Sequence, residues 1–325
     1  MPKLLEIEDL RVKYVTNDAV YYALNGMSLE INEGEVLGLV GETGAGKTTT
    51  ALSIMRLLPK DIGFITGGAI RFSGSDLVGM PENALRKLRG SQMSMIFQDP
   101  MTSLNPVLTV GKQISESLEF HSLGSRSEID AQVDEILHLV GIPASRKHEF
   151  PHQFSGGMKQ RVVIAMALAC KPKLLIADEP TTALDVTVQK QVLNLMLELK
   201  NKLNTSMLLI THDLGIVAQT CDRVAIMYAG EIIEKGSVYD IFDKSGKLRH
   251  PYTRGLFGSL PSLQENSRRL KPIEGLMPDP AELPKGCKFH TRCPKRMDIC
   301  TSEIPEEYEL DGHMIKCHLK EADDE

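Results

Sequence analysis

The sequence predicts an α/β fold, and three observations lead to this prediction. Residues 35–40 form a short apolar run typical of a buried strand, and a glycine-rich turn connects it to a helix that begins near Lys47. A second buried strand is expected at Leu174–Ala177, a short apolar run that directly precedes two acidic residues. Helical periodicity in residues 110–121 and 126–142 separates the two strands. Strands that alternate with helices in this way are typical of an α/β domain.

The composition fits a large folded chain. Its 325 residues, 42% of them hydrophobic, are enough for one large and one small domain. The formal net charge of -6 argues against extensive nucleic-acid binding, so no nucleic-acid partner is expected. The first residues do not have the form of a signal peptide, and the longest apolar run, residues 162–170, is far shorter than the ~18 residues that span a bilayer. We therefore expect a cytoplasmic location with reduced cysteines.

The glycine-rich turn predicts a polyphosphate-binding loop. Residues 41–48 match the pattern G-x-x-x-x-G-K-[ST], in which glycines let backbone N–H groups converge on an anion at the start of a helix. We expect Lys47 to bridge the β- and γ-phosphates of the bound polyphosphate and the Thr48 hydroxyl to coordinate Mg2+. The alternative is an ordinary glycine turn before a helix. The expected ATP-binding residues of this segment are Gly41, Glu42, Thr43, Gly44, Ala45, Gly46, Lys47, Thr48 and Thr49.

Two acidic residues after the Leu174–Ala177 strand supply groups that ATP hydrolysis needs. Ligands bind at the carboxyl ends of parallel strands, and Asp178 and Glu179 occupy such an end. We expect Asp178 to hold Mg2+ through its water shell and Glu179 to polarise the attacking water. The alternative is that both acids cap the helix that follows.

A second helix start, at residues 155–157, offers further anion donors. The sequence Ser155-Gly156-Gly157 precedes a helix expected from Met158 to Ala169, and it presents a hydroxyl and uncovered backbone N–H groups. Alone this pattern is weak, because any serine cap followed by glycines has the same form. Its position shortly before the acidic pair indicates a second polyphosphate-binding end in the same chain.

Together these motifs resemble the ATP-binding subunit of an ABC transporter. The family's motifs occur here in the family's order: the phosphate loop, Gln98 in IFQDP, the signature FSGGMKQR, LLIADEPT, ALD at 183–185 and His212 in LITHD. The resemblance covers about residues 4–240. The signature departs from the common L-S-G-G-Q at Phe154 and Met158, while the phosphate-facing Ser155 and Gly157 are retained.

The resemblance implies a particular fold. It is a P-loop NTPase (RecA-like) ABC ATPase core with an antiparallel β subdomain and an α-helical subdomain at about 99–157. The ATPase domain is expected at residues 1–240, followed by a small loop-rich C-terminal extension at 241–325. In this family the helical subdomain receives a coupling helix from a membrane-spanning partner.

The resemblance also implies that two subunits pair head to tail, with each ATP between the phosphate loop of one and the signature of the other. Residues 155–157 would then bind the γ-phosphate in trans, and Asp185 would organise the site of the facing subunit. Gln98 would contact Mg2+ and the attacking water, and His212 would hydrogen-bond the γ-phosphate. For His212 the alternative is a strand-end histidine in an ordinary turn.

The adenine end of the site is expected at Tyr14. This family stacks the base on an aromatic residue from its first strands, and Tyr14 in LRVKYVTND occupies that place. Tyr21 and Tyr22 are competitors, and a half-buried packing role is the alternative for any of the three.

The last part of the chain contains four cysteines in a segment with little apolar periodicity. Such a segment would fold poorly without a cross-link, such as a metal site or a disulfide. Cys287, Cys293, Cys300 and Cys317 are separated by five, six and sixteen residues. Reduced thiols at one site suggest ligation by all four. The spacing lacks the C-x-x-C pairs typical of structural zinc, and Pro294 follows Cys293, as prolines often do near iron–sulfur ligands. An iron–sulfur cluster, zinc, and unliganded or disulfide-bonded thiols all stay open.

Three segments of this region resemble the C-terminal extension of dipeptide and oligopeptide importers: HPYTRGL at 250–256, LPKGCKFHTRCPKRMDIC at 283–300 and KCH at 316–318. There the four cysteines can carry a [4Fe-4S] cluster, which the resemblance implies here, with zinc as the alternative. Three histidines are possible substitute zinc ligands, although solvated loop histidines are the simpler interpretation: His290, His313 and His318. Cys170 and Cys221 lie in apolar contexts and are expected to be inert buried thiols.

The resemblance therefore implies an ATPase that drives dipeptide or oligopeptide import at the cytoplasmic face of the cell membrane. The implied partners are a second ATP-binding subunit, identical or homologous, two membrane-spanning permease subunits and an extracytoplasmic peptide-binding protein. Nickel or oligosaccharide is the alternative cargo. A soluble ABC-type ATPase or an iron–sulfur redox protein without membrane partners is the alternative of another class. The single phosphate loop and signature disfavour the first of these, and the lack of a flavin or nicotinamide fingerprint disfavours the second.

Overall fold

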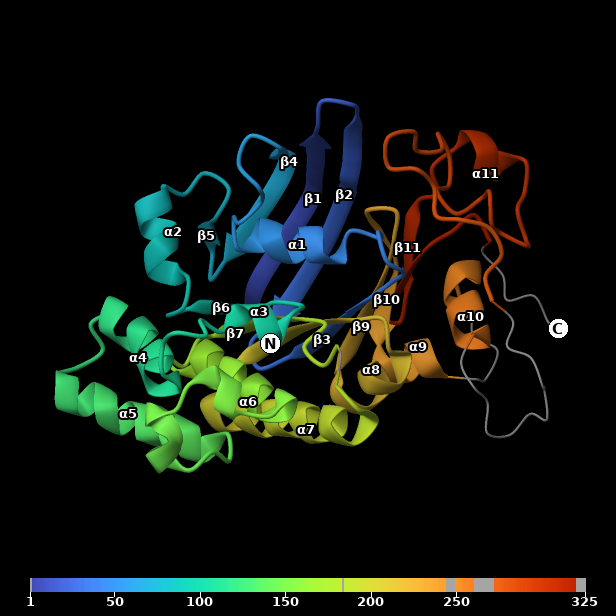
Figure 1. Cartoon of the computed structure of the whole chain (residues 1–325). Coiled ribbons are helices and arrows are strands. Elements are labelled where there is room, and N and C mark those ends of the chain that lie inside the picture. Colours follow the sequence, from blue (N-terminus) through green and yellow to red (C-terminus); the bar gives the residue numbers. More distant parts are fainter. Residues whose placement is uncertain (1, 183, 244–248, 260–271, 320–325) are drawn as a thin grey trace. The chain divides into compact units, whose positions relative to one another are not determined.

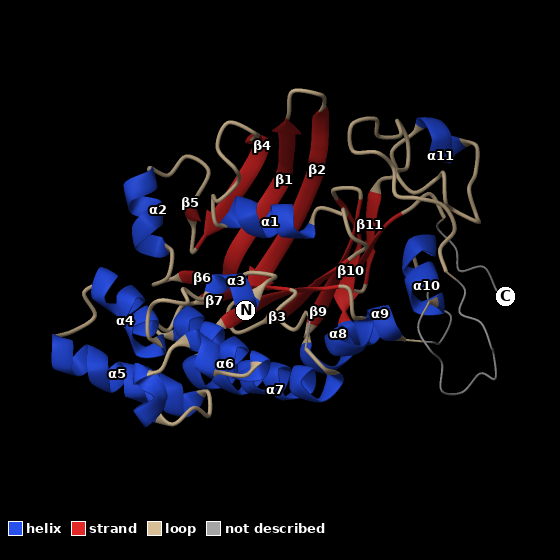
Figure 2. Cartoon of the chain, in the orientation of Figure 1, coloured by secondary structure: helices blue, strands red, loops and turns tan. Residues whose placement is uncertain are grey.

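The computed structural model describes residues 2–182, 184–243, 249–259 and 272–319 (Figure 1). They fall into two compact units. Unit 1 consists of the described residues within Met1–Leu5, Ile31–Val36 and Phe72–Ile210. Unit 2 consists of those within Glu6–Glu30, Leu37–Arg71 and Thr211–Glu325. Both units combine helices with strands, so the α/β prediction is confirmed (Figure 2).

Unit 1 contains a parallel sheet. Strand β6 (Met93–Ile96) pairs with β7 (Leu174–Asp178), and β7 pairs with β8 (Ser206–Thr211). Every residue of β7 and β8 is buried, as expected for parallel strands that are covered on both faces. The two-residue strand β5 (Ser75–Asp76) also belongs to this unit.

Four helices of unit 1 pack on one another: α4 (Val110–Phe120), α5 (Arg126–Leu139), α6 (Gly156–Leu168) and α7 (Val186–Leu203). Helix α4 buries Val110, Ile114 and Leu118 at four-residue spacing, so one face of it meets the core. Helix α5 begins with a capping box between Ser125 and Glu128. The shorter elements are α2 (Glu82–Leu88), α3 (Pro100–Ser103), and the 3-10 helices at Ala144–His148 and Pro151–Gln153.

Unit 2 holds strands of two sheets. The first has the order β2 (Val20–Asn32), β1 (Lys3–Val15), β4 (Gly63–Phe72). The second has the order β11 (Glu307–Leu310), β12 (His313–Lys316), β10 (Glu231–Ser237), β9 (Arg223–Tyr228), β3 (Val36–Val40). Strand β3 is parallel to β9, and the other three pairs are antiparallel. The helices are α1 (Lys47–Ile54), α8 (Leu214–Thr220), α9 (Val238–Phe242), α10 (Pro251–Gly258) and α11 (Ile299–Ser302).

The C-terminal region completes the core of unit 2. Strand β12 pairs with β10, and the Lys316 ammonium lies 2.7 Å from the Glu231 carboxylate. Tyr228, Tyr252 and Phe289 form a buried aromatic cluster with ring centroids 4.7, 5.2 and 5.4 Å apart. Residues that follow position 240 therefore supply both strands and core side chains to this unit.

The elements expected from the sequence lie close to their expected positions. The strand predicted at 35–40 is β3, and the one predicted at Leu174–Ala177 is β7. The helix predicted from Met158 begins two residues earlier, because Ser155 has the extended backbone of a cap residue and both glycines enter the first turn. Within the described ranges, no helix is long and apolar enough to cross a membrane.

Candidate functional site

The predicted phosphate loop joins β3 to α1 in unit 2. The Lys47 side chain is almost completely buried, and its ammonium donates to the carbonyls of Gly41, at 2.7 Å, and Glu42, at 3.1 Å. Gly44 and Gly46 have φ of +85° and +109°, which favour glycine. No side chain caps the start of α1, so its first N–H groups face the loop without a competing side-chain acceptor. The loop thus presents one cation and a helix start to an anion.

Tyr14 lies beside this loop. Its hydroxyl is 3.2 Å from the Thr49 hydroxyl, in the first turn of α1. Tyr22, one of its competitors, is about half exposed, and its N–H donates to the Pro280 carbonyl at 2.8 Å. The structure thus brings Tyr14 next to one of the predicted ATP-binding residues. Stacking on adenine stays a prediction.

The acidic pair lies at the end of β7, in unit 1. Asp178 is 1% exposed, as the last residue of the strand. Glu179 has a φ of +46°, a left-handed conformation that costs energy for a non-glycine residue and is concentrated at functional sites. Its N–H donates to the Ile210 carbonyl at 2.9 Å, which fixes this turn to β8.

The structure brings Gln98 and Glu179 together. The Gln98 amide donates to Glu179 Oε2 at 3.3 Å, and the Thr182 hydroxyl donates to the same oxygen at 3.2 Å. The two residues are 81 positions apart in the sequence, and both were predicted to act on the attacking water. A carboxylate oriented by an amide and a hydroxyl is suited to accept a proton from water or to hold water in place.

The signature segment exposes two of the three residues that were expected to bind phosphate in trans, while the third, Gly157, is half-buried. Ser155 and Gly156 are exposed at the start of α6, whereas Phe154 is buried beneath the Arg146 guanidinium, 4.4 Å from its ring centroid. Arg146 also donates to the Met158 sulfur at 3.4 Å. Both departures from the common signature therefore make packing contacts within unit 1, and they leave Ser155 accessible.

Two further predicted residues lie at helix starts. Asp185 caps α7, with its carboxylate accepting from the N–H groups of Thr187 and Val188 at 3.1 and 3.0 Å. His212 is exposed between β8 and α8, in unit 2. Ala183, the first residue of the ALD motif, lies outside the described residues.

The four C-terminal cysteines are free thiols that lie within electrostatic range of one another. Burial raises the pKa of Cys287, Cys293 and Cys317 to about 11, and neighbouring cysteines of the same set add to each increase. Hydrogen bonds from backbone N–H groups oppose this increase in pKa: the Phe289 N–H donates to Cys287, and the Lys295 N–H donates to Cys293. Within the described ranges, however, no three His, Cys, Asp or Glu residues form a group that could hold a metal ion.

The three histidines of the zinc alternative have other partners. His290 Nδ1 lies 2.8 Å from the Cys287 carbonyl, and His318 Nε2 lies 3.1 Å from the Glu303 carbonyl. The interpretation as a solvated loop histidine is wrong for His313, which is buried in β12 with Nε2 2.8 Å from Glu234 Oε1. His313 lies in a strand that pairs with β10, which explains why it is buried and not solvated.

Cys170 and Cys221 are half-buried, and burial raises their pKa values to about 11 and about 12. Both are therefore neutral thiols near pH 7, in agreement with the prediction of inert cysteines.

Two residues that touch the phosphate loop were missed in the sequence. Tyr252 and Arg292 both contact Glu42, across 210 and 250 positions. The HPY motif and the arginine before Cys293 can be read in the sequence, but no local sequence pattern predicts that they contact the phosphate loop.

Two family models match this chain. The model described as ABC transporter matches residues 24–182, and the one described as Oligopeptide/dipeptide transporter, C-terminal region, matches residues 233–300. Among solved structures, the dimeric post-hydrolysis state of the ATP-binding cassette MJ0796 bound to ADP and Pi is similar, with a TM-score of 0.64 and 27% identity. That match covers 72% of this chain and 98% of the other. Fold and sequence together define an ABC-type ATPase.

Relatives with nearly the same length place the chain more narrowly. The dipeptide transport ATP-binding protein DppD of Bacillus subtilis (strain 168) is 48% identical over 324 residues, covering 99% of this chain and 96% of that protein. The oligopeptide transport ATP-binding protein OppD of Salmonella typhimurium is 48% identical over 316 residues, covering 97% and 93%. The chain belongs to the family of ATP-binding subunits of dipeptide and oligopeptide ABC transporters.

Proposed function

We propose that this chain hydrolyses ATP to drive the import of dipeptides or oligopeptides. The observation that carries the proposal is that the ABC transporter match and the peptide-transporter C-terminal match occur in one chain. The relatives that cover nearly all of it are named for peptide transport, which favours peptides over nickel or oligosaccharides.

The proposed chemistry uses the residues predicted from the motifs. Lys47 would neutralise the β- and γ-phosphates, and Thr48 would supply a hydroxyl oxygen to Mg2+. Asp178, buried at the end of β7, would supply a carboxylate to the water shell of Mg2+, for which oxygen ligands are suited. Mg2+ would neutralise charge that develops on the phosphate oxygens during hydrolysis.

Glu179 is the proposed base. Its carboxylate would accept a proton from the attacking water, while Gln98 would orient both that water and Glu179 through the 3.3 Å contact. His212 would donate to the γ-phosphate. The left-handed backbone at Glu179 supports this assignment, because such strained conformations are concentrated at functional sites.

A second ATP-binding subunit, identical or homologous, would complete each site. The proposed groups in trans are Ser155, Gly156 and Gly157 of the signature, with Asp185 near the facing subunit's nucleotide. The exposure of Ser155 and Gly156 supports this, because residues buried at the start of α6 could not contact a second subunit. The similar cassette MJ0796 has a solved structure that is described as dimeric.

The remaining proposed partners are two membrane-spanning permeases and, through them, an extracytoplasmic peptide-binding protein. The chain would then act at the cytoplasmic face of the membrane. The test is ATP hydrolysis by the reassembled complex in liposomes, with dipeptide, oligopeptide, nickel or oligosaccharide supplied to its binding protein. Peptide should stimulate hydrolysis and accumulate inside; stimulation by nickel or oligosaccharide alone would contradict the peptide assignment.

We also propose that Cys287, Cys293, Cys300 and Cys317 hold a [4Fe-4S] cluster, with zinc as the runner-up. The mutual electrostatic range of the thiols and the backbone N–H donors that face three of their sulfurs support the proposal, since such donors stabilise thiolates. Against the cluster counts the fact that, among the described residues, no three His, Cys, Asp or Glu residues form a group that could hold a metal ion. Iron and acid-labile sulfide analysis after anaerobic purification should find both elements, and zinc without iron would refute the cluster.

A further inference from the structure

Glu42, the second residue of the phosphate loop, is held by two residues of the C-terminal region. Its carboxylate accepts from Arg292 at both oxygens, with Nη1 2.6 Å from Oε2 and Nη2 3.1 Å from Oε1. Its own N–H donates to the Tyr252 hydroxyl at 3.0 Å. The side chain and the backbone of one loop residue are therefore both fixed from outside the loop. All of these residues belong to unit 2.

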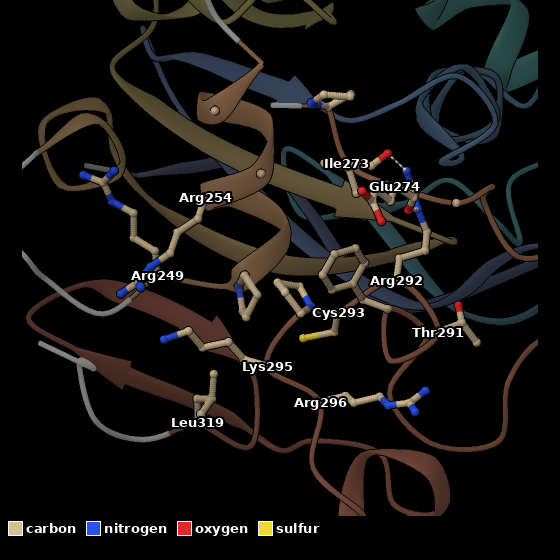
Figure 3. A pocket seen from close by; sticks show the side chains of 17 residues that line it. Arg249, Arg254, Ile273, Glu274, Thr291, Arg292, Cys293, Lys295, Arg296 and Leu319 are labelled. Carbon is tan, nitrogen blue, oxygen red and sulfur yellow. Dashed lines mark hydrogen bonds between the residues drawn. The ribbon is translucent and has the colours of Figure 1, made fainter. Parts of the chain in front are cut away.

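Arg292 is itself held in one orientation. Its side chain is 5% exposed, and beyond Glu42 it donates to the carbonyls of Glu274 and Ile273 at 3.0 and 3.4 Å, on the wall of a cavity of about 840 Å³ (Figure 3). A third neighbour, the Tyr228 hydroxyl, lies 3.4 Å from Nη1. Two parallel bonds from a planar guanidinium to one carboxylate fix the direction as well as the distance.

Tyr252 is anchored just as firmly. It is fully buried in the cluster with Tyr228 and Phe289, and it follows His250, which caps α10 by accepting from the Tyr252 N–H at 3.1 Å. The His250 N–H donates in turn to Glu234 at 2.9 Å. The HPY motif therefore holds the Tyr252 hydroxyl next to the phosphate loop from a well-packed segment.

The charge of Glu42 gives these contacts a functional meaning. A carboxylate in a loop that binds polyphosphate repels the ligand, unless a cation close to it cancels the charge. Arg292 is that cation, and the pair is largely shielded from water, so salt screens it weakly.

We infer that Arg292 and Tyr252 are positioning residues for ATP binding, which neutralise Glu42 and fix the backbone of the phosphate loop. The inference rests on the proposed role of residues 41–48. It makes the C-terminal region part of the nucleotide site of its own chain. Because Arg292 directly precedes Cys293, the ion pair between Arg292 and Glu42 also connects the cysteine segment to the phosphate loop.

The test measures Mg-ATP and Mg-ADP affinity by calorimetry for the wild type and for Arg292→Ala, Arg292→Lys, Glu42→Gln and the double variant Arg292→Ala/Glu42→Gln. Arg292→Ala should bind Mg-ATP about tenfold more weakly, because it leaves a carboxylate unpaired beside the phosphates. The loss should be smaller for Mg-ADP, which carries less charge. The double variant should recover most of the affinity, since the repelling charge is gone, and Arg292→Lys should lie between Ala and wild type.

The matched control is Arg296→Ala, an exposed arginine four residues further on, which should leave affinity unchanged. Tyr252→Phe, which keeps the ring, should raise KM for ATP with little change in kcat. Equal affinities for Arg292→Ala and Arg296→Ala, or a double variant as weak as Arg292→Ala with native thermal stability, would overturn the inference. Lys47→Ala tests the loop itself: if it keeps wild-type affinity, the proposed nucleotide site has failed rather than the role of Arg292.

Discussion

Glu179 shows how a single residue combines an unusual backbone with a specific partner. Its positive φ and its contact with Gln98 are independent features of the turn that follows β7. Structural strain of this kind persists where the surrounding contacts enforce it. The N–H bond from Glu179 to Ile210 of β8 is such a contact.

Replacement of this carboxylate by an amide should separate binding from hydrolysis. Glu179→Gln keeps the shape of the side chain but cannot accept the proton, so steady hydrolysis should fall about 100-fold or more while Mg-ATP affinity is retained. Glu198→Gln, the same exchange at an exposed position of α7, is the control. Turnover at the wild-type rate in Glu179→Gln would assign the base to another residue.

His250 makes the stability of unit 2 depend on acid. Complete burial lowers its pKa from 6.5 to about 3, so the folded protein keeps it neutral while the unfolded chain protonates it below pH 6.5. The unfolded state then binds more protons, and stability should fall as the pH is lowered from 6.5 towards 3. Thermal unfolding followed against pH should show a shallower decline in His250→Asn, which retains a cap acceptor. The same slope in both proteins would show that other groups control it.

At the scale of elements, the contact between α6 and α7 depends on Gly157. A Cβ at this position would lie 2.7 Å from Val188 Cγ1, so a larger residue would force Val188 to shift. At Gly156 the nearest atom would be 4.0 Å away, on Leu184. One glycine of the signature is therefore packed against α7, and the other is exposed.

This difference predicts opposite outcomes for two neighbouring substitutions. Gly157→Ala should destabilise the fold by about 1–3 kcal/mol through overpacking, whereas Gly156→Ala should be close to neutral. Denaturant unfolding measures both. Adding Val188→Ala to Gly157→Ala should restore most of the stability; if it does not, the packing explanation is wrong. Hydrolysis that stays low in the restored double variant would point to a further role of Gly157 in phosphate binding.

The local parts of this account could be predicted from the sequence. The strand–turn–helix at 36–54, the strand that ends at Asp178 and the capped start of α6 all depend on short-range patterns of apolar residues, glycines and caps. The role of Gln98 was predicted only through the family resemblance, and its contact with Glu179 was not predicted. The bonds from Arg292 and Tyr252 to Glu42, and the burial of His313, could not be predicted, because they join residues that only the tertiary fold brings together.

For the molecule as a whole, the C-terminal region acts as a structural part of unit 2. Strand β12 covers the edge of β10, and Tyr252 and Phe289 fill the core around Tyr228. A chain cut after residue 240 would expose both that strand edge and that core.

We therefore expect residues 1–240 alone to aggregate or to unfold at a clearly lower temperature than the full chain. Solubility on expression and thermal unfolding measure this directly. A fragment that is soluble, as stable as the full chain and able to bind Mg-ATP with the same affinity would show that the C-terminal region is an independent appendage.

In the proposed mechanism, one ATP is held between the phosphate loop of one subunit and the signature of another. A structure of the Glu179→Gln protein, in complex with its partner subunit and Mg-ATP, would test this arrangement. We expect the Ser155 hydroxyl about 3 Å from the γ-phosphate of a nucleotide whose phosphates contact Lys47 of the opposite subunit. A nucleotide bound at Lys47 with no Ser155 near it in a closed complex would contradict this arrangement.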